Sequence, residues 1–208
     1  PRLNSLSTII NLAMRPRWCF EMLRTQRRSF RNVVGHAEGV SDLSSLSAWV
    51  SEAFDLKFTW DDIARIKDWW GGKLIIKGIL DLEDAELAIK SGADALIVSN
   101  HGGRQLDGAS SSISILPQIA DSVGRKIEVW FDGGIRSGQD ILKALALGAK
   151  STLIGRPYLY GLGAFGESGV TKTLEILEKE LDITMALCGC TNIENVNERI
   201  LKAKNFIY

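Results

Sequence analysis

From about residue 59 onward, short apolar runs alternate with amphipathic segments of about ten residues. The apolar runs predict buried strands, which we place at 73–77, 95–99, 127–131 and 151–154. The amphipathic segments predict helices, which we place at 60–70, 81–91, 114–123, 139–147, 158–167 and 170–181. Strands that alternate with helices are typical of βαβ units and of a parallel sheet.

Local signals support these helices. Ser137 and Asp140 have the spacing of a capping box at the start of the helix at 139–147. In the helix at 60–70, one of two adjacent tryptophans, Trp69 or Trp70, falls on the apolar face and is expected to pack inward.

The number of strands limits the architecture. A (β/α)8 TIM barrel needs eight strands and typically about 250 residues. Four βα units in a chain of 208 residues predict the C-terminal half of such a barrel over residues 56–208, after an irregular or helical basic segment over 1–55. The alternative is a small open, doubly wound sheet. That fold normally has its phosphate-binding glycines after the first strand, whereas here they follow the last two.

The first forty residues differ in character from the rest. Before Val34 there are seven arginines and one acidic residue, Glu21, interleaved with apolar residues such as Trp18 and Phe20. This pattern is typical of a segment that lies in a membrane interface. It equally fits a basic loop with a short amphipathic helix that packs on its own protein, and both interpretations stay open. No apolar run approaches the ~20 residues of a membrane span.

Amino-acid composition indicates which binding partners and which cellular location to expect. The 25 basic and 25 acidic residues balance, so no net field favours nucleic acid. Three cysteines without a framework pattern favour reduced thiols and a cytoplasmic location. Cys188 and Cys190 have no further Cys or His to complete a metal site, so we expect small structural thiols there and no metal. Because Pro1 opens the chain without a signal peptide, we expect a fragment or a processed piece.

Each predicted strand ends in polar residues or glycine. These ends are Lys77, Ser99-Asn100-His101, Asp132-Gly133-Gly134 and Gly155-Arg156. In a parallel barrel the carboxyl ends of the strands converge on one rim, where ligands bind. The sequence therefore predicts a ligand site at this rim.

The last two strand ends have the character of a phosphate site. In the run Asp132-Gly133-Gly134-Ile135-Arg136, two glycines let backbone amides approach a ligand and Arg136 adds a positive charge. Gly155 and Arg156 add an amide and a second guanidinium at the start of a helix, whose N–H groups favour anions.

The second strand end predicts acid–base chemistry. His101 is flanked by glycines that leave room for a substrate, and an imidazole can move protons near neutral pH. Arg104, three residues later, could hold a carboxylate in a bidentate fork. Lys77 is expected to finish a buried strand and so to need an anionic partner. His36 has no such surroundings and is expected to be structural.

At these residues the chain resembles the family of FMN-dependent 2-hydroxy acid dehydrogenases and oxidases. The similarity covers roughly residues 55–195, and the run His-Gly-Gly-Arg-Gln-Leu-Asp at 101–107 is highly specific. The other matching segments are 76–78, 132–136, 144–149 and 154–157. Within the family, segments 15–19 and 69–81 look most like the respiratory L-lactate dehydrogenase branch.

The resemblance implies a TIM barrel, FMN as cofactor and a role for each residue at the rim. Lys77 would stabilise the reduced flavin, and Ser99 would contact the flavin or its ribityl chain. His101 would accept the substrate's proton, and Arg104 would anchor its carboxylate. The ribityl and phosphate groups would be held by the remaining rim residues, which are Asp132, Gly133, Gly134, Ile135, Arg136, Gly155 and Arg156.

The implied reaction oxidises a small 2-hydroxy acid, above all L-lactate to pyruvate, with a quinone or another respiratory acceptor. The enzyme would be cytoplasmic and could lie peripherally on the inner face of the cell membrane. Two alternatives stay open, which are an oxidase that uses oxygen and a half-barrel fragment that is not catalytic. A phosphate-binding barrel of another kind, such as an isomerase, fits the run at 101–107 less well.

The resemblance also implies a missing half. The family's first four strands are absent, together with a substrate tyrosine and the carboxylate that orients the histidine. Open edges of a half barrel favour strand pairing. We therefore expect a homo-oligomer or pairing with the N-terminal half.

Overall fold

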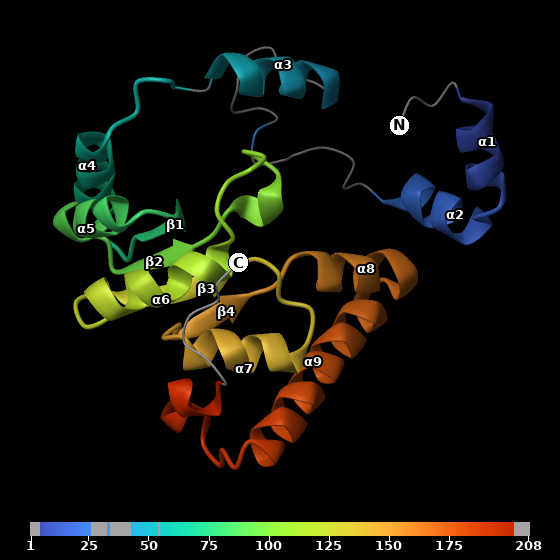
Figure 1. The fold of residues 1–208 in the computed structure, drawn as a ribbon. Coiled ribbons are helices and arrows are strands. Elements are labelled where there is room, and N and C mark those ends of the chain that lie inside the picture. The colour runs from blue at the N-terminus through green and yellow to red at the C-terminus, as the bar shows by residue number, and fades with distance from the viewer. Residues whose placement is uncertain (1–4, 26–32, 34–42, 54, 202–208) are drawn as a thin grey trace. The chain divides into compact units, whose positions relative to one another are not determined.

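The computed structural model describes residues 5–25, 33, 43–53 and 55–201 (Figure 1). Two compact units divide between Phe58 and Thr59, and each is described by itself. The arginines at positions 2, 27, 28 and 31 and the histidine at 36 lie outside the described residues.

The first unit is helical where it is described. Its helices are α1 (Leu6–Ala13), α2 (Pro16–Arg24) and α3 (Leu43–Ala53). Pro16 is the first residue of α2, a position that needs no N–H donor. Many large apolar side chains of α1 and α2 are exposed, with Leu6 at 74% and Phe20 at 58%. No helix among the described residues is long and apolar enough to cross a membrane.

The second unit alternates strands and helices as the sequence predicts. Its strands are β1 (Ile75–Ile79), β2 (Ala95–Val98), β3 (Glu128–Asp132) and β4 (Ser151–Leu153). Its α-helices are α4 (Trp60–Trp70), α5 (Leu82–Lys90), α6 (Ser112–Val123), α7 (Gly138–Ala146), α8 (Arg156–Phe165) and α9 (Glu167–Leu187). Short 3-10 helices are η1 (His101–Gly103), η2 (Ile193–Asn195) and η3 (Glu198–Ile200). The capping box of Ser137 and Asp140 at the start of α7 is confirmed.

The strands form one parallel sheet in the order β1-β2-β3-β4, so consecutive strands are neighbours (Figure 1). The helices between them, α5, α6 and α7, all contribute to one core with the strands. Buried residues of that core include Ala88, Leu116, Val129 and Phe131. A doubly wound sheet would have helices of this kind on both faces, so the shared core argues against that alternative.

The predicted bounds of the first strand were wrong by two residues. Residues 73 and 74 precede β1 because Asp94, before β2, binds them: its carboxylate accepts from the Lys73 ammonium at 2.7 Å and from the Leu74 N–H at 2.9 Å. Lys67 donates to the same carboxylate at 2.5 Å. Hydrogen bonds from Lys67 and then Lys73 hold the pKa of Asp94 well below its usual range.

An irregularity at Gly78 extends β1 beyond Lys77. Lys77 pairs with Ile97, but Ile79 pairs with the next residue, Val98, so Gly78 is an extra residue in β1. Its φ of 107° is a conformation that favours glycine. As a result Ile79 joins the core on the helix side. In a regular strand, side chains two positions apart point to the same face, so Ile79 would share the face of Lys77.

Two expectations about burial were wrong. Trp69 and Trp70 are 76% and 67% exposed. Trp69 instead lies against the guanidinium of Arg65, whose carbon is 5.4 Å from its ring centre, and the Trp70 indole N–H donates to the Lys73 carbonyl at 3.1 Å. Cys188 is also exposed, because it follows the last turn of α9 rather than packing beneath it.

Helices α8 and α9 pack closely where two glycines meet. A Cβ at Gly161 would collide with the carbonyl oxygen of Gly169, and a Cβ at Gly169 would collide with the carbonyl of Gly161. Glycine at both positions therefore allows the two backbones to touch. Gly163 lies two residues later in α8, and a Cβ added there would meet nothing within 4 Å.

We expect the substitutions Gly161→Ala and Gly163→Ala to act in opposite directions. Overpacking at position 161 should destabilise the protein by about 1–3 kcal/mol. The better helix propensity of alanine at position 163 should stabilise it by about 0.5–1 kcal/mol. Urea unfolding of the two variants measures both changes, and equal midpoints would contradict the close packing.

Candidate active site

A buried hydroxyl and an ion pair join three neighbouring strands near their carboxyl ends. Lys77 of β1 lies 2.6 Å from the Asp132 carboxylate of β3, with its Nζ as donor. Ser99, directly after β2, donates to the same carboxylate oxygen at 2.6 Å and accepts from the Lys77 ammonium at 2.8 Å. The three side chains therefore form a triangle, and we call them the Lys77–Ser99–Asp132 cluster.

The electrostatics of the cluster favour a charged Asp132. Burial is the largest single influence and raises the pKa of Asp132, but the hydrogen bonds from Lys77 and Ser99 and the charge interactions with Lys77 and His101 lower it. The net result is a pKa below the ordinary value. The carboxylate is thus ionised near neutral pH, and it compensates the Lys77 charge.

The position and the burial of Lys77 differ from those predicted. It was expected to finish a buried strand, but it lies in the middle of β1 and its side chain is 38% exposed. The anionic partner that it needs is already supplied by Asp132. Sequence alone gave no register between β1 and β3, so this pairing could not be predicted.

The loop after β2 places His101 and Arg104 at the rim. Among the described residues, His101 is the one non-glycine residue with a left-handed backbone, at φ 57°. Gly102 and Gly103 follow it with φ 68° and 70°. Side-chain and backbone oxygens of Asn100 accept from the N–H groups of Gly102 and Gly103 at 3.1 and 3.0 Å. Both His101 and Arg104 are exposed.

The opposite side of the rim is suited to an anion. Gly133 and Gly134 have φ 123° and 78°, and a Cβ at Gly134 or Gly155 would meet nothing within 4 Å. Backbone amides are therefore approachable at these positions. Gly155 is the N-cap of α8 and provides no side-chain cap, so the positive end of this ten-residue helix faces the rim without a covering group.

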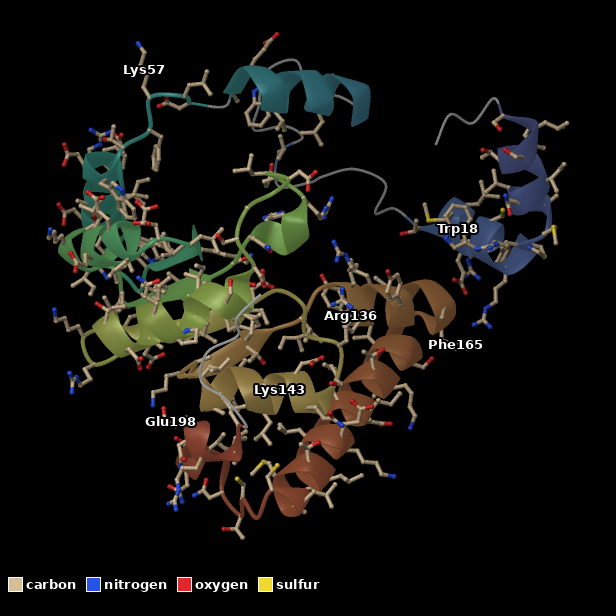
Figure 2. All side chains as sticks on the ribbon, in the orientation of Figure 1. Trp18, Lys57, Arg136, Lys143, Phe165 and Glu198 are labelled. Atoms are coloured by element: carbon tan, nitrogen blue, oxygen red, sulfur yellow. The ribbon has the colours of Figure 1, made fainter. Side chains whose placement is uncertain are left out.

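Two arginines accompany these glycines. The Arg156 guanidinium donates to the Gly102 carbonyl at 2.8 Å, which links the start of α8 to the His101 loop. Arg136 donates to the Ile135 carbonyl at 2.8 Å, and its own N–H is held by Asp140 at 2.9 Å. Figure 2 shows Arg136 on the side of the sheet from which α8 begins.

One cavity of about 330 Å³ gathers these groups. Its lining includes all but one of the residues to which the family resemblance assigns a role, namely Lys77, His101, Arg104, Asp132, Gly133, Gly134, Ile135, Arg136, Gly155 and Arg156. The exception is Ser99, which is 1% exposed and lies beneath the cavity.

The lining also includes Gly102, a glycine that flanks His101 in the sequence, and three residues that the sequence analysis missed, Leu153, Tyr158 and Leu159. Tyr158 lies in the first turn of α8, two residues after Arg156. Its position next to the predicted anion-binding start of this helix could have identified it as a lining residue. A larger cavity of about 540 Å³, lined mainly by residues 145–150 and 193–199, contains none of the predicted residues.

The profile of one family, FMN-dependent dehydrogenase, matches residues 1–203 of this chain. The chain belongs to the FMN-dependent dehydrogenase family. An L-lactate dehydrogenase from Caulobacter vibrioides is 44% identical over 194 residues, which are 93% of this chain and 51% of that protein. The 2-hydroxyacid oxidase 1 of Mus musculus is 45% identical over 161 residues, covering 77% of this chain and 44% of that protein. The chain thus spans about half the length of the curated relatives it matches.

Solved structures of the family agree with the architecture. The monotopic membrane protein (S)-mandelate dehydrogenase superposes with a TM-score of 0.84 at 38% identity, over 94% of this chain and 52% of that one. A mandelate oxidase variant with a monooxide FMN adduct superposes with a TM-score of 0.65 at 45% identity, over 67% of this chain and 44% of that one. The predictions of the family and of half a TIM barrel are confirmed.

We expect the substitution Lys77→Met to raise the pKa of Asp132. Without the ammonium, the effect of burial would be opposed mainly by Ser99. In the unsubstituted chain, the Lys77–Asp132 pair should persist as the pH falls below the usual aspartate value of about 4. It should be lost only as the pH passes through the lowered pKa.

Carboxyl ¹³C chemical shifts measured against pH would follow this titration. Lys73→Met is the matched control, because Lys73 pairs with Asp94 rather than with Asp132. An Asp132 midpoint that is the same in the Lys77→Met variant and in the original chain would contradict the proposed electrostatics.

Proposed function

We propose that this chain is the C-terminal half of an FMN-dependent enzyme that oxidises an L-2-hydroxy acid, with L-lactate as substrate and a respiratory acceptor such as a quinone. The observation that supports this most directly is the gathering of an ammonium, an imidazole and two arginine–glycine clusters around one cavity. The names of the relatives, L-lactate dehydrogenase and 2-hydroxyacid oxidase, support the substrate class.

The rim fits the phosphate end of FMN. Approachable amides at Gly134 and Gly155, the exposed start of α8, and the guanidinium groups of Arg136 and Arg156 are the donors that a phosphate needs. Lys77 would lie at the flavin ring, where a positive charge favours the anionic reduced form. When bound, FMN would supply the two-electron acceptor that no side chain here provides.

The His101 loop fits the substrate. The Arg104 guanidinium would hold the substrate carboxylate, and a nitrogen of the His101 imidazole would accept a proton as the 2-hydroxy acid becomes a 2-oxo acid. Both groups come from one short loop in which Gly102 and Gly103 leave space. The oxidation removes two electrons and two protons from the substrate. The two electrons and one proton would pass to FMN, and the imidazole would take the other proton and pass it to solvent before the next turnover.

We expect the purified chain to bind FMN more tightly than riboflavin, because only FMN has the phosphate that the arginines hold. Replacing Arg156 with Gln should weaken FMN binding by about tenfold or more, the loss expected for a charge-assisted hydrogen bond, and should leave riboflavin binding almost unchanged. Quenching of flavin fluorescence measures both affinities. Equal affinities for FMN and riboflavin would contradict the phosphate site.

Substrate oxidation is tested on the flavin-loaded chain, alone and after addition of the N-terminal half from an L-lactate dehydrogenase relative. L-Lactate should bleach the flavin without oxygen, and His101→Gln should prevent bleaching while FMN remains bound. Reoxidation by a quinone analogue rather than by oxygen would distinguish a dehydrogenase from an oxidase. A chain that binds FMN but never bleaches in either form would support the alternative of a non-catalytic fragment.

We further propose that α1 and α2 contact an anionic membrane surface. Trp18 and Phe20 are 50% and 58% exposed on α2 (Figure 2 labels Trp18), and Arg15, Arg17 and Arg24 lie beside them in the sequence. Exposed aromatic rings among arginines suit the boundary between lipid headgroups and acyl chains. The match to a monotopic membrane protein over 94% of this chain agrees with this proposal.

The chain should therefore sediment with vesicles that contain phosphatidylglycerol and less with pure phosphatidylcholine. The double substitution Trp18→Ser and Phe20→Ser should release it, because both the apolar contacts and the ring beside Arg24 are lost. Phe165→Ser is the matched control, since Phe165 is 78% exposed in the other unit. Release by Phe165→Ser alone, or no release by the double substitution, would favour packing of the segment on its own protein.

A further inference from the structure

We propose that Ser99 is a positioning residue: its one hydroxyl fixes both the backbone of His101 and the Lys77–Asp132 pair. The inference rests on the proposed function, which assigns His101 to proton transfer and Lys77 to the cofactor. It also gives Ser99 a different role from the flavin contact that the family resemblance implies.

The first support is that the Ser99 hydroxyl makes every hydrogen bond of which it is capable. A serine hydroxyl has one hydrogen to donate and two lone pairs that accept. The hydrogen is donated to the Asp132 carboxylate at 2.6 Å. The lone pairs accept from the Lys77 ammonium at 2.8 Å and from the His101 N–H at 3.0 Å. Protein groups therefore occupy all three bonding positions of the hydroxyl.

The second support is burial. The Ser99 residue is 1% exposed, whereas Lys77 and His101 are exposed and line the cavity. A ligand in the cavity would thus meet the partners of Ser99 rather than Ser99 itself. The hydroxyl acts through those partners.

The third support is the unusual backbone of His101. A left-handed conformation is unfavourable for a residue with a Cβ, so surrounding contacts must hold it. His101 has φ 57°. Among its described contacts, the bond from its N–H to Ser99 ties the start of the loop to the end of β2. The bond from Arg156 to the Gly102 carbonyl ties the next residue to the start of α8.

These contacts allow loss of the His101 N–H bond to be distinguished from loss of the Lys77–Asp132 pair. A general weakening of the fold would affect both. In a Ser99→Ala variant, the direct bond between Lys77 and Asp132 at 2.6 Å does not need the hydroxyl, so the pair should remain. The His101 N–H, in contrast, would lose its partner. In an Asp132→Asn variant the reverse holds: the ion pair is lost, while the hydroxyl can still accept from the His101 N–H.

Amide hydrogen exchange of the flavin-free chain, followed residue by residue by NMR, tests the proposal. The His101 amide should be protected in the original chain and in Asp132→Asn. In Ser99→Ala it should exchange about tenfold faster or more, as expected for the loss of a hydrogen-bond partner. Ser91→Ala is the matched control, because Ser91 is also buried but bonds the Trp60 carbonyl away from the rim.

Two results would overturn the proposal. One is a His101 amide in the original chain that exchanges as fast as that of Leu106 in the exposed part of the same loop, a measurement that needs no variant to fold. The other is unchanged His101 exchange in Ser99→Ala. Because these measurements use no flavin, they stand apart from the proposed function.

FMN titration of Ser99→Ala and Asp132→Asn then distinguishes the two roles. If Ser99 only positions its partners, Ser99→Ala should retain most of the FMN affinity, and Asp132→Asn should weaken it at least as much. Loss of FMN binding in Ser99→Ala with His101 still protected would show a direct flavin contact instead. No FMN binding by the original chain would reject the proposed function and leave the exchange result valid.

Discussion

The ion pair between Lys77 and Asp132 is the interaction on which the geometry of the rim depends. It joins β1 to β3 across the end of β2, so it fixes the relative positions of strands that are not direct neighbours. Two opposite charges in a partly buried place satisfy each other, and neither needs a ligand to be stable there. The site can therefore hold its shape before any ligand arrives, which reduces the entropy that binding would cost.

The sequence predicted the parts of this site that depend on a single segment. Apolar runs located the strands, and glycine, serine and aspartate located the helix ends. The polar residues after each strand could then be expected to lie close together, because parallel strands direct their carboxyl ends to one edge. Most of the residues that line the cavity, among them His101, Asp132 and Arg156, were predicted in this way.

What the sequence could not predict depends on pairing between segments. The extra residue at Gly78 changes the register of β1 against β2, and nothing in the local pattern marks it. The choice of Asp132 as the partner of Lys77, and the three bonds of Ser99, need distances across strands. Periodicity placed one of Trp69 and Trp70 on the apolar face of its helix, but both are exposed. The Trp69 ring lies against Arg65, and the Trp70 indole N–H donates to the Lys73 carbonyl. These errors share one cause: short-range pattern does not determine long-range neighbours.

The extra residue at Gly78 has a consequence for how β1 can vary. It allows Lys77 to project toward the ligand cavity while Ile79, two positions later, fills the core beneath the helices. In a regular strand these two positions would share a face, and a change in the size of one would press on the other. Here the chemical and the packing requirements of a five-residue strand are separated. The core around Ile79 can thus be reshaped by substitution without moving the ammonium that faces the cavity.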